Sequence, residues 1–571
     1  MSSRKHIQFQ DNAQEEDSIQ LLDHEGKARN SESGEDEGKE GAPIPPPEET
    51  IKRGLNFWLV ITGLIFTLML SGLEANITAT ALPTIVHELG QSNQFVWILH
   101  SFTLASTVIQ PPIGQLADVF GRKTPMLLSV LSFTVGSLIS GLATNMGVMI
   151  LGRVLQGCGS GGTFVLADLI VSDIIPLRER PAFMGILMTG SSIAYAAGPS
   201  IGGMMTEYLS WRWAYLINVP VGILALVVLA FSLRLKQQTR KTLAEAVSQI
   251  DFLGTIVLSG STGALMAALS ADEGFWKSGS LIAAFVLGLL GMISFVFLQN
   301  SRFCPHPIMP GRMFNLSSSL AFVLAFLANG IMMLVPYFLP IYFQAVLQVS
   351  PAKAGVYLLA TVLTLLPAAM AIGVFVTKTG FMRSAHVGSF ALMAVSAAGY
   401  MITDQHTTAA QWVPLSMIGA IGIGGMIPTA LPAAQAPLPE SDVAAVTATF
   451  AFFRSLGFLW GFAMPSFIFK TRVDDLIPKV ASIDSATADV LRSGGAFANA
   501  RASFIRSLSA PARLQVILLY VQSLSAVWKM MFGAALVGIV VAVVQPPIPL
   551  RESLDSEFGV QEHNKAQDVE S

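Results

Sequence analysis

Runs of apolar residues separated by short polar segments follow one another along most of this 571-residue chain. A helix of about 20 apolar residues is long enough to cross roughly 30 Å of hydrocarbon. Runs of that kind lie at approximately 57–83, 95–116, 124–143, 147–171, 182–205, 213–233, 252–270, 280–298, 318–345, 354–376, 385–402, 412–435, 443–468 and 524–544. Their grouping predicts an all-α membrane protein with 14 spans, arranged as two six-helix bundles plus two extra transmembrane helices.

The polar segments between and around these runs divide the chain into regions. The regions that we expect are a disordered acidic tail (1–54), an N-terminal six-helix bundle (55–235), two inserted helices (250–300), a C-terminal six-helix bundle (316–545) and a second tail (546–571). A polar stretch within the last bundle, residues 470–523, is predicted to form an extracellular loop with short amphipathic helices on the outer surface.

Basic residues in the short loops predict the orientation of the spans. With the amino terminus inside, the cytosolic loops contain Lys52, Arg53, Arg122, Lys123, Arg178, Arg180, Arg234, Lys236, Arg240, Lys241, Arg302, Arg312, Lys378 and Arg383. The outer loops contain Arg212, Lys277 and Lys353, apart from the basic residues of the 470–523 loop, and long loops obey this rule weakly. Both termini are therefore predicted to be cytosolic.

Composition excludes several classes of protein. Hydrophobic residues make up 52% of the chain and charged residues 12%, which excludes an ordinary soluble domain. The two cysteines, Cys158 and Cys304, lack the spacing of a disulfide scaffold or a metal site. The Gly-x-Gly-x-x-Gly pattern at 157–162 lies within a span and follows no strand, so it does not indicate a dinucleotide site. We expect no enzyme activity, no metal, no cofactor and no nucleic-acid partner.

The ten residues from Gly114 to Lys123 join the second and third predicted spans on the cytosolic side. They place the Asp118 carboxylate and the Arg122 guanidinium beside Gly121, which permits a tight turn. A loop that only fixed the topology would need the cations alone. The segment resembles the signature loop of the major facilitator superfamily, in which the aspartate and the arginine latch neighbouring helices in one state of the transport cycle.

Two further motifs follow. The sequence Arg153-Val154-Leu155-Gln156-Gly157 resembles the arginine motif that is linked with proton coupling, and Gly198-Pro199-Ser200-Ile201-Gly202-Gly203 resembles the glycine-proline motif typical of antiporters. The glycines allow a neighbouring helix to pack closely, and the proline permits a bend. Similarity to the fungal fourteen-spanner drug:proton antiporter group extends over about residues 56–545 and includes Trp211-Arg212-Trp213, Asn218-Val219-Pro220-Val221-Gly222, the segment from Tyr337 to Gln344, and Phe453-Arg454-Ser455-Leu456-Gly457.

Ionisable residues inside a bilayer are costly and therefore informative. Glu74 in the first span and Arg153 in the fourth lie at comparable predicted depth, so they can pair if these spans are neighbours. Together with Asp168 they are the candidates for proton coupling. The alternative for Glu74 is a silent structural role, either in an ion pair with Arg153 or in a hydrogen bond to Asn76.

Other charged residues are expected nearer the cytosolic surface. Asp168 lies 15 residues after Arg153 on the same span, roughly 22 Å away by helical rise, so the two cannot pair. We expect Asp168 and Asp173 to meet Arg178, Arg180 or the segment from Gly114 to Lys123, which we call the Asp118 loop. Arg454, midway along the thirteenth span, must face the protein interior or water, where it could neutralise a carboxyl or bind an anionic substrate, and the sequence indicates no particular partner for it.

The second half contains a weak counterpart of the Asp118 loop in Gly380-Phe381-Met382-Arg383. Such duplication is expected if two bundles rock about a central site. A substrate cavity between them is predicted to be largely apolar, with few hydrogen-bonding groups. The candidates for its lining are Asn76, Gln156, Asn329, Tyr337, Gln344, Phe453 and Arg454.

The resemblance implies a secondary active transporter, a proton-coupled antiporter that exports small organic compounds such as drugs, toxins or secondary metabolites. Its partners would be the lipid bilayer, a small-molecule substrate and protons, with the proton gradient as energy source and a monomer as the unit. The alternatives are a siderophore or basic amino acid transporter and, from another class, a non-transporting membrane sensor. The plasma membrane is the expected location, and the vacuolar membrane is the alternative because the segment from Asp17 to Leu22 has the form of an acidic dileucine signal.

Overall fold

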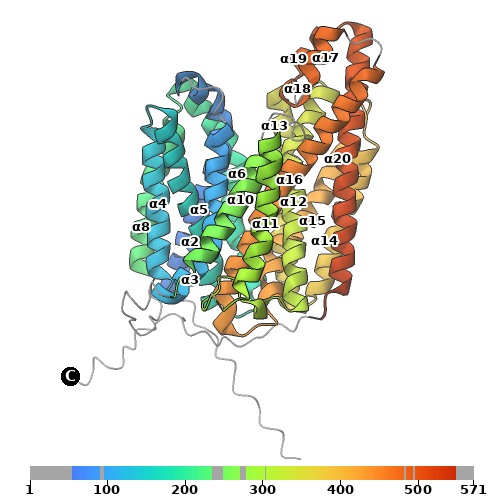
Figure 1. Cartoon of the computed structure of the whole chain (residues 1–571). Coiled ribbons are helices and arrows are strands. Elements are labelled where there is room, and N and C mark those ends of the chain that lie inside the picture. The colour runs from blue at the N-terminus through green and yellow to red at the C-terminus, as the bar shows by residue number, and fades with distance from the viewer. Residues whose placement is uncertain are drawn as a thin grey trace, which may run out of the picture. The chain divides into compact units, whose positions relative to one another are not determined.

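The structure, a computed structural model, describes residues 54–89, 96–233, 249–269, 278–302, 304–480, 484–492 and 495–547. The two predicted tails lie outside these ranges except at their inner ends, and so does the segment from Asp17 to Leu22. The described part of the chain folds into long helices joined by short connections (Figure 1).

A helix covers each of the apolar runs. The N-terminal half consists of α2 (Leu55–Leu89), α3 (Val96–Phe120), α4 (Lys123–Gly141), α5 (Met146–Ile174), α6 (Arg180–Tyr208), α7 (Trp213–Leu216) and α8 (Asn218–Ser232). The inserted pair consists of α10 (Phe252–Leu269) and α11 (Gly279–Gln299). The C-terminal half contains α12 (Leu316–Ile341), α13 (Pro351–Thr379), α14 (Met382–Met401), α15 (Ala409–Gln435), α16 (Val443–Leu476) and α20 (Ala510–Val544).

The stretch between α16 and α20 is shorter than the predicted loop of residues 470–523, because both helices continue into it. Short helices lie between them, namely α17 (Ser485–Leu491), α18 (Gly495–Ala498) and α19 (Ala502–Ser507). Helix α20 begins well before residue 524, since a hydrogen-bonded helix can extend beyond the apolar run that crosses the hydrocarbon.

Within the described part of the chain, 10 helices are both long and apolar enough to cross a membrane. The runs that coincide with α3, α6, α10 and α14 are helical but fall outside that set. The protein is therefore a multi-pass membrane protein, and the number of 14 spans remains a prediction.

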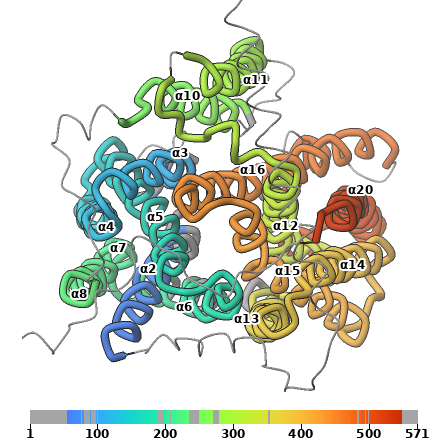
Figure 2. Tube along the Cα trace, turned by 90° about the horizontal axis from the view of Figure 1, so that it is seen from below, coloured from blue at the N-terminus to red at the C-terminus, as the bar shows by residue number. Residues whose placement is uncertain are grey.

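The helix contacts of the N-terminal half are repeated in the C-terminal half. In the first half, α2 packs against α6 and α8, α5 against α3 and α4, and α4 against α8. In the second half, α12 packs against α16 and α20, α15 against α13 and α14, and α14 against α20. Between the halves, the most extensive contacts are those of α3 with α16 and of α6 with α13, and these two contacts correspond to each other in the two halves (Figure 2). This repetition is the arrangement expected of two related bundles that move against each other.

The turns after α3 and α13 occupy corresponding places in the two halves, and both depend on glycine. Gly121 has φ of 75° and Gly380 has φ of 72°, a conformation that is strained for other residues. The sequence similarity between the Asp118 loop and the segment that begins at Gly380 thus has a structural counterpart.

The inserted pair lies beside α3 (Figure 2). The Asp251 carboxylate joins the two helices, because it accepts hydrogen bonds from the Gly254 amide at 2.6 Å and from Gln299 Nε2 at 2.6 Å. The Asp251 amide donates to Gln115 Oε1 on α3 at 3.0 Å. Burial, together with the neighbouring Asp251 carboxylate, raises the pKa of the Cys304 thiol to about 12, so this thiol remains protonated.

Glycines allow α5 to pack between α3 and α4. A Cβ atom at Gly161 would overlap the backbone oxygen of Ser106 on α3, and one at Gly159 would overlap the backbone of Phe133 on α4. Small residues of this kind permit close approach of helix backbones in membranes. The Gly-x-Gly-x-x-Gly pattern therefore serves helix packing.

Replacing Gly159 by alanine is expected to lower the melting temperature and the yield of folded protein, because overpacking costs about 1–3 kcal/mol. Gly533→Ala on α20 is the matched control, since a Cβ atom there meets no other atom within 4 Å. Thermal unfolding of both purified variants measures the effect. Equal melting temperatures for Gly159→Ala and the control would contradict the packing argument.

Candidate functional site

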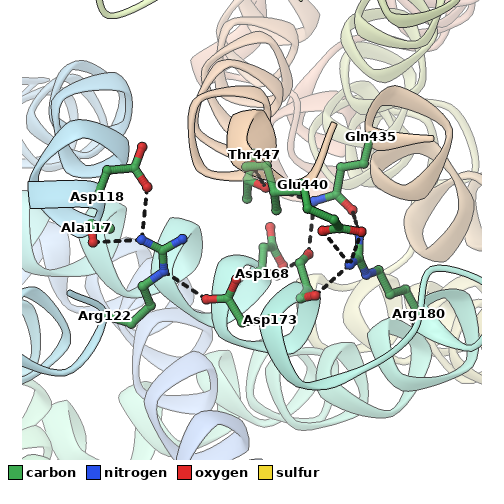
Figure 3. Close-up of polar contacts among 11 residues, drawn as sticks. Ala117, Asp118, Arg122, Asp168, Asp173, Arg180, Gln435, Glu440 and Thr447 are labelled. Carbon is green, nitrogen blue, oxygen red and sulfur yellow. Dashed lines mark hydrogen bonds and ion pairs between the residues drawn. The ribbon is translucent and has the colours of Figure 1, made fainter. Parts of the chain in front are cut away.

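The loop between α3 and α4 is organised by the Arg122 guanidinium. Arg122 Nη1 donates to the Ala117 carbonyl at 2.7 Å and to Asp118 Oδ1 at 2.9 Å, and its Nε donates to Asp173 Oδ2 at 2.8 Å (Figure 3). Lys123 Nζ donates to the Ala230 carbonyl at 2.7 Å. The loop thereby connects α3, α4, α5 and α8. As expected, Asp173 meets the Asp118 loop.

The two halves are joined by an ion pair that the sequence did not indicate. Arg454 Nη1 on α16 lies 3.1 Å from Asp168 Oδ2 on α5, and the two side chains are 14% and 2% exposed. The partners expected for Asp168, which were Arg178, Arg180 or the Asp118 loop, are wrong. Asp168 comes more than one helical turn before Asp173 and contacts α16. On α3, one turn before Gly114, Gln110 Nε2 donates a hydrogen bond to Ser455 Oγ at 2.9 Å, which is again a contact between the halves.

A second inter-half connection centres on Gln435 at the end of α15. Its Oε1 accepts from Arg180 Nη1 at 2.8 Å, and its Nε2 donates to Ser172 Oγ at 2.9 Å and to Thr447 Oγ1 at 2.8 Å (Figure 3). Arg180 Nη2 also donates to the Ser172 carbonyl at 2.6 Å and lies 3.4 Å from Glu440 Oε2. Arg180 and Gln435 are each 1% exposed, so these bonds are shielded from solvent.

Sequence reasoning used Arg180 for topology and as a possible partner of Asp168 and Asp173, and it missed Gln435, Glu440 and Thr447. The available signal was the position of Gln435 and Thr447 within or beside apolar runs, where an unpaired polar side chain would be costly.

A further contact joins the Arg178 Nε atom on the α6 side to the Thr377 carbonyl on α13 at 3.2 Å. All of these inter-half contacts lie toward the end of the molecule that contains the Asp118 loop, which we call the Asp118 end.

Close packing accompanies the polar contacts at this end. A Cβ atom at Gly114 would lie 2.7 Å from Ala448 Cβ on α16, and one at Gly373 on α13 would lie 2.6 Å from the Pro181 carbonyl on α6. The glycine of the signature loop therefore allows α3 to approach the opposite half. Any larger side chain at either position would push the halves apart at the Asp118 end.

A separate buried ion pair lies within the N-terminal half. Arg153 Nη1 on α5 pairs with Glu74 Oε1 on α2, as the sequence indicated was possible, and the two residues are 1% and 0% exposed. Thr78 Oγ1 donates to Glu74 Oε1 at 2.8 Å, and Asn218 Nδ2 on α8 donates to Glu74 Oε2 at 2.5 Å. Both carboxylate oxygens therefore have partners, and one carboxylate connects α2, α5 and α8.

Arg153 is held from several sides. Its Nε donates to the Ile98 carbonyl at 2.9 Å, its Nη1 donates to Gln156 Oε1 at 2.9 Å, and its guanidinium lies over the Phe102 ring at 4.4 Å from the centroid. Gln156 Nε2 donates in turn to Ser137 Oγ on α4 at 2.7 Å. Gln156 thus belongs to the cluster around the Glu74–Arg153 pair, which also includes Thr78 and Asn218 and which we call the Glu74 centre. All of these contacts lie within the N-terminal half.

The other predicted lining residues that the structure describes lie on α12, in the turn after it and on α16, which packs against α12. Asn329 Nδ2 donates to the Ala325 carbonyl one turn earlier at 2.7 Å, Phe453 stacks on Phe322 at 5.3 Å between centroids, and Tyr337 contacts the Phe462 ring at 4.7 Å. Gln344 lies in a π-helical turn, Tyr342–Val346, after α12. In the antiporter motif Gly198 and Gly202 are buried, whereas the side-chain surroundings of Asn76, Pro199 and Gly203 lie outside the described part of the structure. The substrate cavity remains a prediction.

Removing Arg122 is expected to destabilise the protein much more than neutralising Asp118. Arg122→Ala leaves the Asp173 carboxylate, 5% exposed, without its partner, which costs about 3–5 kcal/mol. The Asp118 side chain is 42% exposed, so Asp118→Asn is expected to change stability by about 1 kcal/mol or less. Thermal unfolding and folded yield of the two variants measure the difference, and equal losses would mean that Asp173 does not depend on Arg122.

Comparison with known proteins identifies the family. A family profile described as Major Facilitator Superfamily matches residues 64–462. The MFS-type transporter gkaD of Penicillium citrinum is 37% identical over 523 residues, which cover 91% of this chain and 89% of that protein. The MFS efflux transporter aclA of Aspergillus oryzae is 37% identical over 531 residues, covering 92% and 96%.

Two further matches extend this result. The Acurin A biosynthesis cluster MFS-type transporter of Aspergillus aculeatus is 36% identical over 536 residues, covering 92% of this chain and 95% of that protein. The solved structure of the human organic anion transporter MFSD10 matches with a TM-score of 0.53 at 14% identity, covering 85% of this chain and 99% of that one, and thus shares the fold. With the signature loop, the repeated bundles and these matches in agreement, the chain belongs to the major facilitator superfamily of membrane transporters.

Proposed function

We propose that this protein is a proton-coupled antiporter that exports small, largely apolar organic compounds, most specifically secondary metabolites. The observation that carries the proposal is the similarity, at 36–37% identity over 92% of the chain, to proteins named as an efflux transporter and as a transporter of a biosynthesis cluster.

We assign the protein to the plasma membrane, with the vacuolar membrane as the alternative. Imaging of a fluorescent fusion distinguishes the two membranes.

We further propose that the protein has fourteen spans and that the Asp118 end faces the cytosol, as the distribution of basic residues predicts. On that assignment, the pairs Asp168–Arg454, Gln110–Ser455 and Arg180–Gln435 close the transporter on its cytosolic side. Loading of substrate from the cytosol then requires these contacts to break. These contacts are present in the conformation that is closed at the Asp118 end, so they favour it over a conformation that is open there.

Proton coupling is assigned to the Glu74 centre. The ionised carboxylate binds Arg153, Thr78 and Asn218, so it draws α2, α5 and α8 together. Protonation removes the charge that pairs with Arg153 and converts one carboxylate oxygen into a donor, which favours a different packing of these helices. Because the described contacts of Glu74 lie inside the N-terminal half, coupling acts through helix packing.

Glu74→Gln is expected to uncouple export from the proton gradient while substrate still binds, because the side chain stays neutral in every state. The measurement follows a fluorescent substrate in vesicles while a pH difference is imposed and then collapsed. Wild type should transport uphill in proportion to the pH difference, and the variant should only equilibrate the substrate. Glu88→Gln is the matched control, since Glu88 lies on the same helix but is 45% exposed and pairs with Arg212 near its end. Uphill transport by Glu74→Gln would exclude Glu74 as the coupling site.

Breaking the inter-half ion pair is expected to shift the conformational equilibrium toward opening of the Asp118 end. Asp168→Asn and Arg454→Gln should each raise the modification rate of a cysteine placed on the inter-half surface at Ala444, and the exchanged pair Asp168→Arg with Arg454→Asp should restore part of the protection. Removing one charge of a buried pair typically costs about 3–5 kcal/mol. Unchanged modification rates in both single variants would show that this pair does not hold the closed state.

A further inference from the structure

The end of the C-terminal half opposite the Asp118 end contains an open pocket of about 530 Å³. It lies where α12 ends, where α14 is followed by a loop, and where α20 begins. Its polar wall is formed by Gln348, Gln405, Arg506 and Arg513, and its apolar wall by Val346, Leu347, Leu514 and Ile517. A volume of this size is within the usual range of small-molecule sites.

The pocket is positively charged. Arg506 lies in α19 and Arg513 in the first turns of α20, and no carboxylate among the described residues forms an ion pair with either. Asp404, the nearest acid along the chain to Gln405, directs Oδ1 to the His406 amide at 2.8 Å within its own turn. Ala510, which opens the 35-residue helix α20, also lines the pocket, so the positive end of the helix dipole adds to the charge.

Several donors and acceptors at the pocket lack partners. Arg506 Nη2 donates to the Gln348 carbonyl at 2.6 Å, and Arg513 Nη2 donates to the Arg506 and Leu508 carbonyls at 2.7 and 3.1 Å. Arg513 Nε and Gln405 Oε1 are buried and have no hydrogen-bond partner. A guanidinium offers five N–H donors, so these contacts leave most of the donors of the two arginines free for a ligand.

Backbone strain occurs at the same place. Gln348 has φ of 51°, the one positive value among the described residues other than glycine. Its carbonyl is the acceptor for Arg506, so the strained residue positions one of the two arginines. Residues held in such conformations cluster at ligand sites, where the surrounding structure compensates for the strain.

We propose that this pocket, formed by Arg506, Arg513, Gln348 and Gln405 above an apolar wall, binds an amphiphilic anion. The ligand carries a phosphate or carboxylate group that accepts from the two guanidinium groups, and an apolar body that covers Leu347, Leu514 and Ile517. This chemistry is shared by an acidic phospholipid of the surrounding bilayer and by an acidic organic compound on that side of the membrane. The site is independent of the proton-coupling residues.

The test uses the full-length protein in phosphatidylcholine nanodiscs, prepared with and without phosphatidic acid. In a second arm, dodecyl phosphate is added from solution to phosphatidylcholine nanodiscs, and in a third arm inorganic phosphate is added. The melting temperature is measured in each arm for wild type and for Arg506→Gln/Arg513→Gln. Arg501→Gln is the matched control, since Arg501 is an exposed arginine of the same loop that does not line the pocket.

Phosphatidic acid or dodecyl phosphate is expected to raise the melting temperature of wild type and of Arg501→Gln, and the double variant should lose this shift. The affinity for the amphiphile should fall about tenfold or more when the two charged donors are removed. Stabilisation by phosphatidic acid identifies the source as lipid, and stabilisation by dodecyl phosphate alone identifies a ligand from solution. The proposal is overturned if neither amphiphile stabilises wild type, if the double variant retains the full shift, or if inorganic phosphate stabilises as strongly as the amphiphiles.

Discussion

Charges buried among apolar helices must be neutralised by a partner, and this requirement organises the whole structure. An isolated ion in a low-dielectric interior costs several kcal/mol, about the same as the net stability of a protein domain. The chain meets this requirement with Glu74 and Arg153 inside one half, with Arg122 and Asp173 behind the signature loop, and with Asp168 and Arg454 between the halves. Each pair fixes the relative position of the helices that contribute to it.

These pairs are of two kinds, which act at different levels. A pair within one half adjusts how helices pack inside a bundle, whereas a pair between halves exists only while the bundles are closed at that end. In the proposed cycle, protonation of Glu74 and the separation of Asp168 from Arg454 are therefore distinct steps. They are connected through α5, which carries Arg153, Asp168 and Asp173 and packs against α3 and α4 through its glycines. Helix α5 is therefore the element that the Glu74 centre and the Asp118 end share.

Small residues allow these charges to meet. Salt-bridge geometry requires N and O atoms within about 4 Å, which two helices can reach only if their backbones approach closely enough. Gly114 and Gly373 provide that approach between the halves, and Gly159 and Gly161 provide it around α5. The glycine motifs and the charge motifs of the sequence are thus two parts of one requirement, close packing around paired ions.

The sequence by itself determined which segments are helical, where the signature turn lies, and that Glu74 and Arg153 were able to pair. These features depend on local information, namely the length of apolar runs, the freedom of Gly121 and depth along a helix of fixed rise. Only the tertiary structure decided that Asp168 meets Arg454, that Gln435 joins α15 to α5 and α6, and that Gln156 belongs to the Glu74 centre. Depth along a span is encoded by residue number, but the direction in which a side chain points depends on the rotation of each helix about its axis. That rotation is set by packing among helices far apart in the sequence, which no local pattern records.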